Sequence, residues 1–282
     1  MPAPDLPPPP NFRVDERPLH VHLHAKLTDP AAFAGAVVIV IDALRASVTI
    51  TAALANGAAH VVPVLTVEEA IATKARMAGS GTQGGTGRPP PGPLPPGGGV
   101  VLGGERGGIL IPGFDLDNSP RNYTRERVAG RTVIFTTSNG TAALLHARAA
   151  AEILVGSFAN LSAVCDAVAH DPRPVHILCC GTRDELSLDD ILPAGALVDR
   201  LTLAGRKLVA DDSARVALMA WRGANASPGG LAAAMHQSRG GRNLAHQNLG
   251  ADVDFCSKLD TVTVVPRFDP AAGHIILKLR PA

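Results

Sequence analysis

The strongest constraint on the fold is the regular alternation of short apolar runs with helix-like segments. The run AVVIVID at 36–42 is followed directly by a segment with helical composition at 47–57. The same order of strand and helix recurs at 60–65 with 67–79, 152–158 with 160–170, and 174–182 with 188–201. Strands that alternate with helices of this length are typical of layered α/β proteins, in which helices cover a sheet.

Two further runs, TVTVVPRF at 261–268 and HIILKL at 274–279, predict a closing pair of antiparallel strands. The predicted fold is therefore a layered α/β/α arrangement with a mixed, mostly parallel sheet. We expect two lobes with the functional site between them: residues 18–130 and residues 131–282. A Pro-rich tail is predicted at 1–17, and a flexible Gly/Pro-rich insertion at 79–99.

Composition excludes several classes of function. The formal net charge is +1 and no long basic stripe is present, so nucleic acid is not an expected partner. No run of 18 apolar residues predicts a membrane span, and no basic segment followed by an apolar stretch predicts a signal peptide. Four cysteines without CxxC spacing indicate reduced thiols, and we expect a cytoplasmic protein.

Polar residues gather where predicted strands end, which is where open α/β sheets bind ligands. Asp42 and Arg45 follow the first long apolar run, and Glu105 is the last residue of another predicted strand at 99–105. Asp42 could simply cap the next helix and pair with Arg45. The functional interpretation is a catalytic or Mg²⁺-binding carboxylate beside an anion-binding guanidinium, with Glu105 as a second metal ligand.

Three other segments carry candidates for binding or catalysis. Hydroxyl and amide groups at 135–141 could bind an anion at a helix start, although ordinary helix capping explains them equally well. A second strand end at 181–195 carries a possible anion ligand and two carboxylates, and a compact basic turn lies at 238–244. The candidates in these segments and in the loop 103–120 are Ser119, Thr137, Asn139, Gly140, Thr141, Arg183 and Arg242 for substrate binding, with Glu185 and Asp190 for catalysis.

With these segments identified, the chain resembles the 2-phosphosulfolactate phosphatases, enzymes of coenzyme M biosynthesis. The resemblance rests on motifs that occur in family order: VVIVIDALRASVTI, GGERGGILIPGFDLDNSP, TTSNGTAAL, GTRDELSLDDILPAG, SRGGRNL and DVDFCSKLDTVTVVP. They cover most of residues 36–266. The tail, the insertion at 79–99 and Asp117, where the family usually carries Gly, depart from the pattern.

The resemblance implies a Mg²⁺-dependent hydrolase that converts (2R)-2-phospho-3-sulfolactate to 3-sulfolactate and phosphate. We expect Asp42 and Glu105 to hold the metal, arginines to bind the polyanionic substrate, and Asp190 or Glu185 to position the attacking water. Covalent capture of the phosphoryl group by Asp42 is the other route, and the sequence does not separate the two.

Two alternative functions remain open. One is a phosphomonoesterase for another small phosphorylated hydroxy acid, suggested by Asp117, and the other is a non-catalytic anion-binding protein. A homo-oligomer is compatible with the sequence, and no macromolecular partner is indicated.

Overall fold

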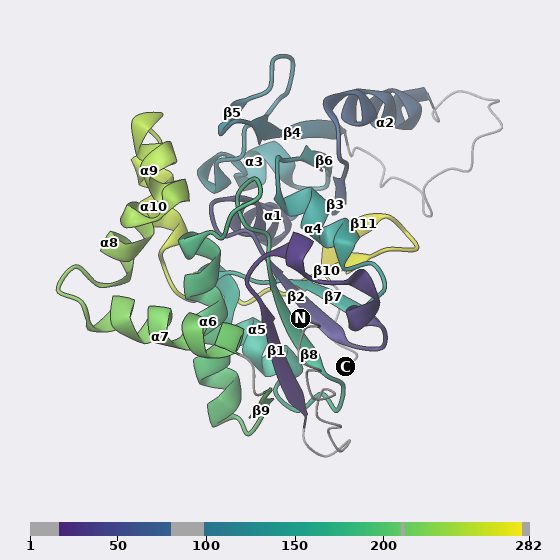
Figure 1. The fold of residues 1–282 in the computed structure, drawn as a ribbon. Helices are drawn as coiled ribbons and strands as arrows, with labels where there is room; N and C mark the ends of the chain where they lie inside the picture. The colour runs from purple at the N-terminus through teal and green to yellow at the C-terminus, as the bar shows by residue number, and fades with distance from the viewer. Residues whose placement is uncertain (1–16, 80–98, 210–211, 278–282) are drawn as a thin grey trace, which may run out of the picture.

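The computed structural model describes residues 17–79, 99–209 and 212–277 (Figure 1). The strands in these residues are β1 (Pro18–His22), β2 (Val37–Ile41), β3 (His60–Pro63), β4 (Val100–Arg106), β5 (Ile109–Leu110), β6 (Thr132–Thr136), β7 (Glu152–Val155), β8 (Val175–Cys179), β9 (Lys207–Leu208), β10 (Pro266–Asp269) and β11 (His274–Leu277).

The α-helices of the described residues are α1 (Ala46–Ala55), α2 (Val67–Gly79), α3 (Arg125–Val128), α4 (Gly140–His146), α5 (Leu161–Val168), α6 (Leu188–Leu203), α7 (Asp212–Ala226), α8 (Gly230–Gln237), α9 (Arg239–His246) and α10 (Gly250–Cys256). The described residues also contain four short 3₁₀ turns: η2 (Ala25–Leu27), η3 (Pro30–Phe33), η4 (Pro120–Asn122) and η5 (Phe158–Asn160).

Within the described ranges, all strands join one mixed sheet in the order β5-β4-β6-β3-β11-β10-β7-β2-β8-β1-β9. The predicted α/β class with a mixed, mostly parallel sheet is confirmed, and so is the antiparallel pairing of the two late strands. The first of these, β10, is shorter than predicted because it begins at Pro266. No helix in the described part of the chain is both long enough and apolar enough to cross a bilayer.

Helices cover both faces of the sheet. Residues of β2 alternate between two cores: Val37, Ile39 and Ile41 pack in the core that contains residues of α5, α6 and α7. Val38 and Val40 pack in the opposite core, with residues of α1 and α4. Every residue of β2 is buried, as expected for a parallel strand enclosed on both faces. A smaller core lies between α2, β4 and β6.

The sheet contains two parallel blocks that are joined by the β10–β11 hairpin. β4, β6 and β3 run parallel to one another, and so do β7, β2, β8, β1 and β9. Three successive antiparallel pairings link β3 to β7 through β11 and β10, so the two blocks run in opposite senses. Adjacent strands in a sheet are rotated relative to one another by about 20–25°. This rotation accumulates from β4 across the sheet to β2, and it largely offsets the reversed direction of the second block.

The two predicted lobes contribute strands to both blocks. β6 comes from residues 131–282 but pairs with β3 and β4, whereas β1 and β2 come from residues 18–130 but pair with β8. The predicted ranges therefore share one sheet. The Pro-rich tail and the 79–99 insertion fall almost wholly outside the described residues.

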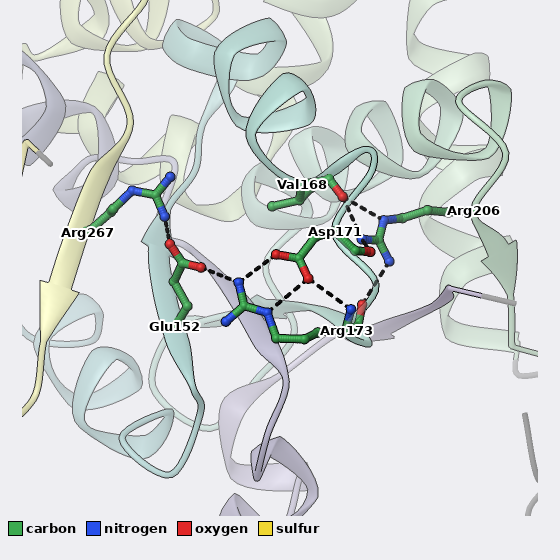
Figure 2. A network of polar contacts seen from close by, with 6 residues as sticks. All are labelled: Glu152, Val168, Asp171, Arg173, Arg206 and Arg267. Atoms are coloured by element: carbon green, nitrogen blue, oxygen red, sulfur yellow. Dashed lines mark hydrogen bonds and ion pairs between the residues drawn. The ribbon is translucent and has the colours of Figure 1, made fainter. Parts of the chain in front are cut away.

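A polar network fastens the edge of the sheet that carries the amino ends of β7 and β8. Figure 2 shows Glu152 between Arg267 of β10 and Arg173, which also binds Asp171. The buried guanidinium of Arg206 donates to the carbonyl oxygens of Val168, Asp171 and Arg173, which lie in α5 and the loop before β8. Val168 is the last residue of α5, so its carbonyl oxygen has no partner within the helix, and Arg206 donates to it from outside.

Candidate active site

A cavity of about 310 Å³ lies where loops from both parallel blocks meet. Its walls come from the carboxyl ends of β2, β4, β6 and β8, and from α9. The convergence of strand ends expected for an α/β sheet is therefore present, although the strands belong to two blocks. Of the predicted site residues, Asp42, Arg45, Glu105, Asn139 and Arg183 line this cavity.

Asp42 follows β2 and is 9% exposed. Its Oδ1 accepts a hydrogen bond of 3.3 Å from the Ala46 amide, and its own amide donates to Ser47 Oγ at 2.9 Å. Burial raises the pKa of Asp42 to about 7, and the nearby charges of Glu105 and Asp189 add to the rise. Asp42 thus accepts a bond from the first amide of α1, whose N-cap residue is Arg45, and also presents a carboxyl group to the cavity.

Glu105 lies in β4 and closes the hairpin to β5. One oxygen, Oε2, accepts from the Gly108 amide at 2.7 Å, and the other, Oε1, accepts from the Ser138 amide at 2.8 Å. The Glu105 carboxylate therefore joins the loops of β4 and β6, and it is 7% exposed. Hydrogen bonds from two amides fix the orientation of this carboxylate at the cavity wall.

Arg45 is the largest fully buried side chain of the described residues, and it still contributes to the cavity wall. Its two terminal nitrogens donate 2.6 Å bonds, one to Asp252 Oδ2 of α10 and the other to the Gly108 carbonyl oxygen. The predicted pairing of Arg45 with Asp42 is not the one observed. Asp252 was not a predicted site residue, because it lies far along the sequence in a short helix.

Arg183 also lines the cavity and lies in the loop after β8. Its backbone has a φ of 58°, in the left-handed region, and its amide donates to Asn139 Oδ1 at 3.2 Å. The side chain of Arg183 is exposed to the cavity. Asn139 thereby links the β6 and β8 loops, and the Arg183 guanidinium remains accessible to an anion.

Two of the predicted catalytic carboxylates do not line the cavity. The two oxygens of Asp190 accept from the Ala43 amide at 2.8 Å and the Gly181 amide at 2.9 Å, so this buried side chain ties the β2 and β8 loops together. Burial, with the charges of Asp189 and Asp42, raises the pKa of Asp190 well above its usual range. Glu185 is exposed and pairs with Arg239.

The remaining predicted binding residues surround the cavity without lining it. Arg242 donates to the Gln237 carbonyl oxygen on the outside of α9. The hydroxyl of Ser119 donates to Asp252 Oδ1 at 2.7 Å. Thr137 and Thr141 are buried, and their hydroxyls have no hydrogen-bond partner among the described residues. Gly140 lies against Asp42, which does line the cavity.

Sequence reasoning missed the wall that α9 supplies. Asn243, His246 and Gln247 line the cavity, and Gln247 Nε2 donates to the Gly107 carbonyl oxygen at 2.8 Å. The basic turn at 238–244 indicated a binding site in this region, but the residue predicted from it was Arg242, which does not line the cavity. Asp189, whose charge helps to raise the pKa of Asp42, was also missed, because carboxylates are common in the first turn of a helix.

Asp117, the departure from the family pattern, does not line the cavity. Its Oδ1 accepts from the Ser119 amide at 3.0 Å and from Asn122 Nδ2 at 2.8 Å. The extra carboxylate thus stabilises the turn that leads into η4.

Three side chains of the cavity carry oxygens that could hold a divalent cation. Asp42 and Glu105 line the same cavity, as does Asn118, whose buried Oδ1 has no hydrogen-bond partner among the described residues. Mg²⁺ binds through one or two carboxylates with further oxygen ligands and waters. No group of three or more His, Cys, Asp or Glu residues in the described ranges has the geometry of a metal site, so waters or substrate oxygens would have to complete this one.

Comparison with known proteins places the chain among enzymes. Residues 22–270 match a family model described as 2-phosphosulpholactate phosphatase. A probable 2-phosphosulfolactate phosphatase of Symbiobacterium thermophilum is 39% identical over 244 residues, which are 86% of this chain and 95% of that protein. Proteins with the same description from Clostridium acetobutylicum and Deinococcus radiodurans are each 36% identical, over 82% and 83% of this chain and 88% of each relative.

Proposed function

Because the chain belongs to the 2-phosphosulfolactate phosphatase family and is thus a phosphoric monoester hydrolase, we propose that it cleaves (2R)-2-phospho-3-sulfolactate to 3-sulfolactate and phosphate. The observation that carries this proposal is that carboxylates and an accessible guanidinium line one cavity. Asp42 and Glu105 come from β2 and β4, and Arg183 comes from the β8 loop.

We also propose that the reaction depends on Mg²⁺. Asp42, Glu105 and the unpaired Oδ1 of Asn118 would hold the ion. When bound, Mg²⁺ would polarise a phosphoryl oxygen and offset the negative charge that develops as the ester bond breaks. Burial, with the nearby charges of Glu105 and Asp189, raises the pKa of Asp42, and a bound cation would offset this by stabilising the ionised carboxylate.

The cationic groups would bind and orient the substrate. The substrate carries a phosphate, a sulfonate and a carboxylate, so it needs more than one positive partner. Arg45 is held rigidly in the wall, whereas Arg183 is exposed and can adjust to its ligand. The planar fork of a guanidinium can donate two hydrogen bonds to one anionic group.

Hydrolysis would form a bond from a water oxygen to phosphorus and break the bond to the ester oxygen. That oxygen takes up a proton and leaves as the hydroxyl of 3-sulfolactate, and the water gives up a proton. Asp190 and Glu185 make other contacts, so we no longer propose either as the group that positions the water. Of the predicted catalytic residues, Asp42 alone lines the cavity, and it would act either at the metal or as the nucleophile.

The contacts of Asp117 remove the reason for proposing a different hydroxy acid as substrate, because its carboxylate binds within its own loop. Phosphate release should be measured with 2-phospho-3-sulfolactate, 2-phospholactate and 2-phosphoglycolate, each with Mg²⁺ and with EDTA. We expect the highest kcat/KM for the sulfonated substrate and loss of activity in EDTA that added Mg²⁺ restores. Equal kcat/KM values would contradict sulfonate recognition, and full activity in EDTA would contradict the metal.

A further inference from the structure

The Arg45 guanidinium is held by contacts that lie behind the cavity wall. Arg45 and its partner Asp252 are each 1% exposed, and the nitrogen–oxygen distance between them is 2.6 Å. The other terminal nitrogen donates to the Gly108 carbonyl oxygen at 2.6 Å. An arginine restrained at both ends of its fork has lost the freedom to swing that a surface arginine retains.

The Asp252 carboxylate is itself restrained. Its Oδ2 accepts from Arg45, and its Oδ1 accepts from the Ser119 hydroxyl at 2.7 Å. Arg121 is more distant, at 3.8 Å from Oδ1, and its side chain is half exposed. Both carboxylate oxygens therefore have a buried partner, so the orientation of Asp252 is fixed from two sides.

We propose that Asp252 is a positioning residue that fixes the Arg45 guanidinium at the cavity wall, with Ser119 holding Asp252 in turn. The inference rests on the proposed function, since Arg45 is to bind an anionic group of the substrate. It assigns a role to α10, which carries Asp252, and to the 117–122 loop, which carries Ser119. Asp252 acts through Arg45 and touches no substrate.

The test compares Asp252→Asn with Asp254→Asn. Asp254 lies on the same helix, but it is exposed, pairs with His236 and does not line the cavity. Loss of positioning should raise the KM of Asp252→Asn on the order of 10–100-fold, because small displacements of a binding group have effects of this size. We expect kcat per active site to stay within about threefold, and Asp254→Asn to match the wild type.

A merely structural role gives a different pattern. It would lower the Tm and the fraction of active enzyme of Asp252→Asn while KM stayed at the wild-type value, and that result would overturn the proposal. Ser119→Ala removes one contact to Asp252 without leaving an unpaired charge. Ser119→Ala should therefore raise KM by a smaller factor than Asp252→Asn. If Asp252→Asn does not fold, the KM of Ser119→Ala tests the proposal instead.

The double variant Arg45→Gln/Asp252→Asn supplies an independent check. If Asp252 acts through Arg45, the double variant should bind substrate no more weakly than Arg45→Gln alone. Additive effects would overturn the proposal.

Binding of inorganic phosphate, measured by calorimetry, separates this inference from the proposed function. Should wild-type protein bind phosphate but release none from 2-phospho-3-sulfolactate, the proposed substrate fails, while a higher phosphate Kd in Asp252→Asn still supports positioning. An unchanged phosphate Kd in both Asp252→Asn and Ser119→Ala would overturn positioning whatever the substrate is.

Discussion

Gly140 lies so close to Asp42 that a β-carbon on residue 140 would stand 2.7 Å from Asp42 Oδ2. The same atom would stand 2.9 Å from the β-carbon of Ala46, so it has no space on either side. Gly140→Ala should therefore displace the Asp42 carboxyl group and lower kcat/KM on the order of 10–100-fold. Steady-state phosphate release measures the loss, and wild-type kcat/KM in this variant would show that Asp42 tolerates displacement.

Gly223→Ala is the matched control for that substitution. Gly223 lies within α7, and a β-carbon there would meet no atom within 4 Å. Alanine favours a helix interior over glycine by about 0.5–1 kcal/mol, so this variant should be slightly more stable and fully active.

Asp42→Asn should lower phosphate release on the order of 10²-fold or more, by removing one preorganised charge from the site. The variant should also be more stable than wild type at pH 8 in EDTA. The pKa of Asp42 rises from 3.8 to about 7 on folding, so the folded state loses stability as pH rises between these values. Asparagine does not ionise and escapes that loss, on the order of 1–3 kcal/mol.

Urea unfolding at pH 8 measures this difference in stability. Asp166→Asn, which removes an exposed carboxylate on α5, should alter neither activity nor the free energy of unfolding. If Asp42→Asn is clearly less stable than wild type, the bond that the Asp42 carboxylate accepts from α1 stabilises the fold by more than ionisation of the buried carboxylate destabilises it.

Two stacked imidazoles between β1 and β8 should make the fold sensitive to mild acid. His22 Nε2 and His176 Nδ1 are 2.8 Å apart, and Phe33 packs edge-on against both rings. Burial lowers the pKa of His22 to about 4, and the neighbouring imidazoles of His20 and His146 add to this shift. Burial likewise lowers the pKa of His176 to about 3, with contributions from His20 and His22. The unfolded chain takes up protons near pH 6.5, so the free energy of unfolding should fall as pH drops from about 7 towards 4.

The double variant His22→Gln/His176→Gln should flatten this dependence between pH 7 and pH 5 by on the order of 2 kcal/mol relative to wild type. Because the comparison is between two proteins at each pH, contributions from carboxyl groups cancel. His170→Gln, at an exposed position, should keep the wild-type slope. Equal slopes in all three proteins would show that the imidazole pair protonates as readily in the folded state.

Arg206→Met should destabilise the protein without changing KM. Arg206 is 2% exposed, and its guanidinium donates to Val168 and Asp171 carbonyl oxygens at 2.5 and 2.7 Å (Figure 2). Methionine fills similar space but cannot donate these hydrogen bonds, and we expect a loss of about 2–4 kcal/mol in urea unfolding. Arg215→Met, on the exposed side of α7, should leave stability nearly unchanged.

Local patterns predicted the parts of the site that follow directly from a strand. Asp42 and Glu105 each come at or beside the end of an apolar run, and the rule for sheet edges is enough to place them in a pocket. Asp190 shows where that reasoning stops: its place in the first turn of a helix suggested an accessible carboxylate, whereas its oxygens bind amides of two neighbouring loops. Hydrogen bonds across 147 residues of sequence have no local signature.

The partner of Arg45 and the wall made by α9 escaped prediction for a related reason. Asp252 and His246 lie in short helices, and the sequence of a short helix does not show which face meets a distant loop. The order of strands was equally hidden. Residues 266–269 read as a strand from their composition, but nothing in them indicates a place at the centre of the sheet.

That central place has a consequence for biosynthesis. The ribosome makes β10 and β11 after every other described strand. Until then, the edge of β3 that pairs with β11 and the edge of β7 that pairs with β10 have no partner among the described strands. Exposed strand edges recruit other chains, and a nascent polypeptide in this state is a natural client for chaperones. Arrival of the hairpin joins the two half-sheets, and a chain released before it would carry both halves without the element that unites them.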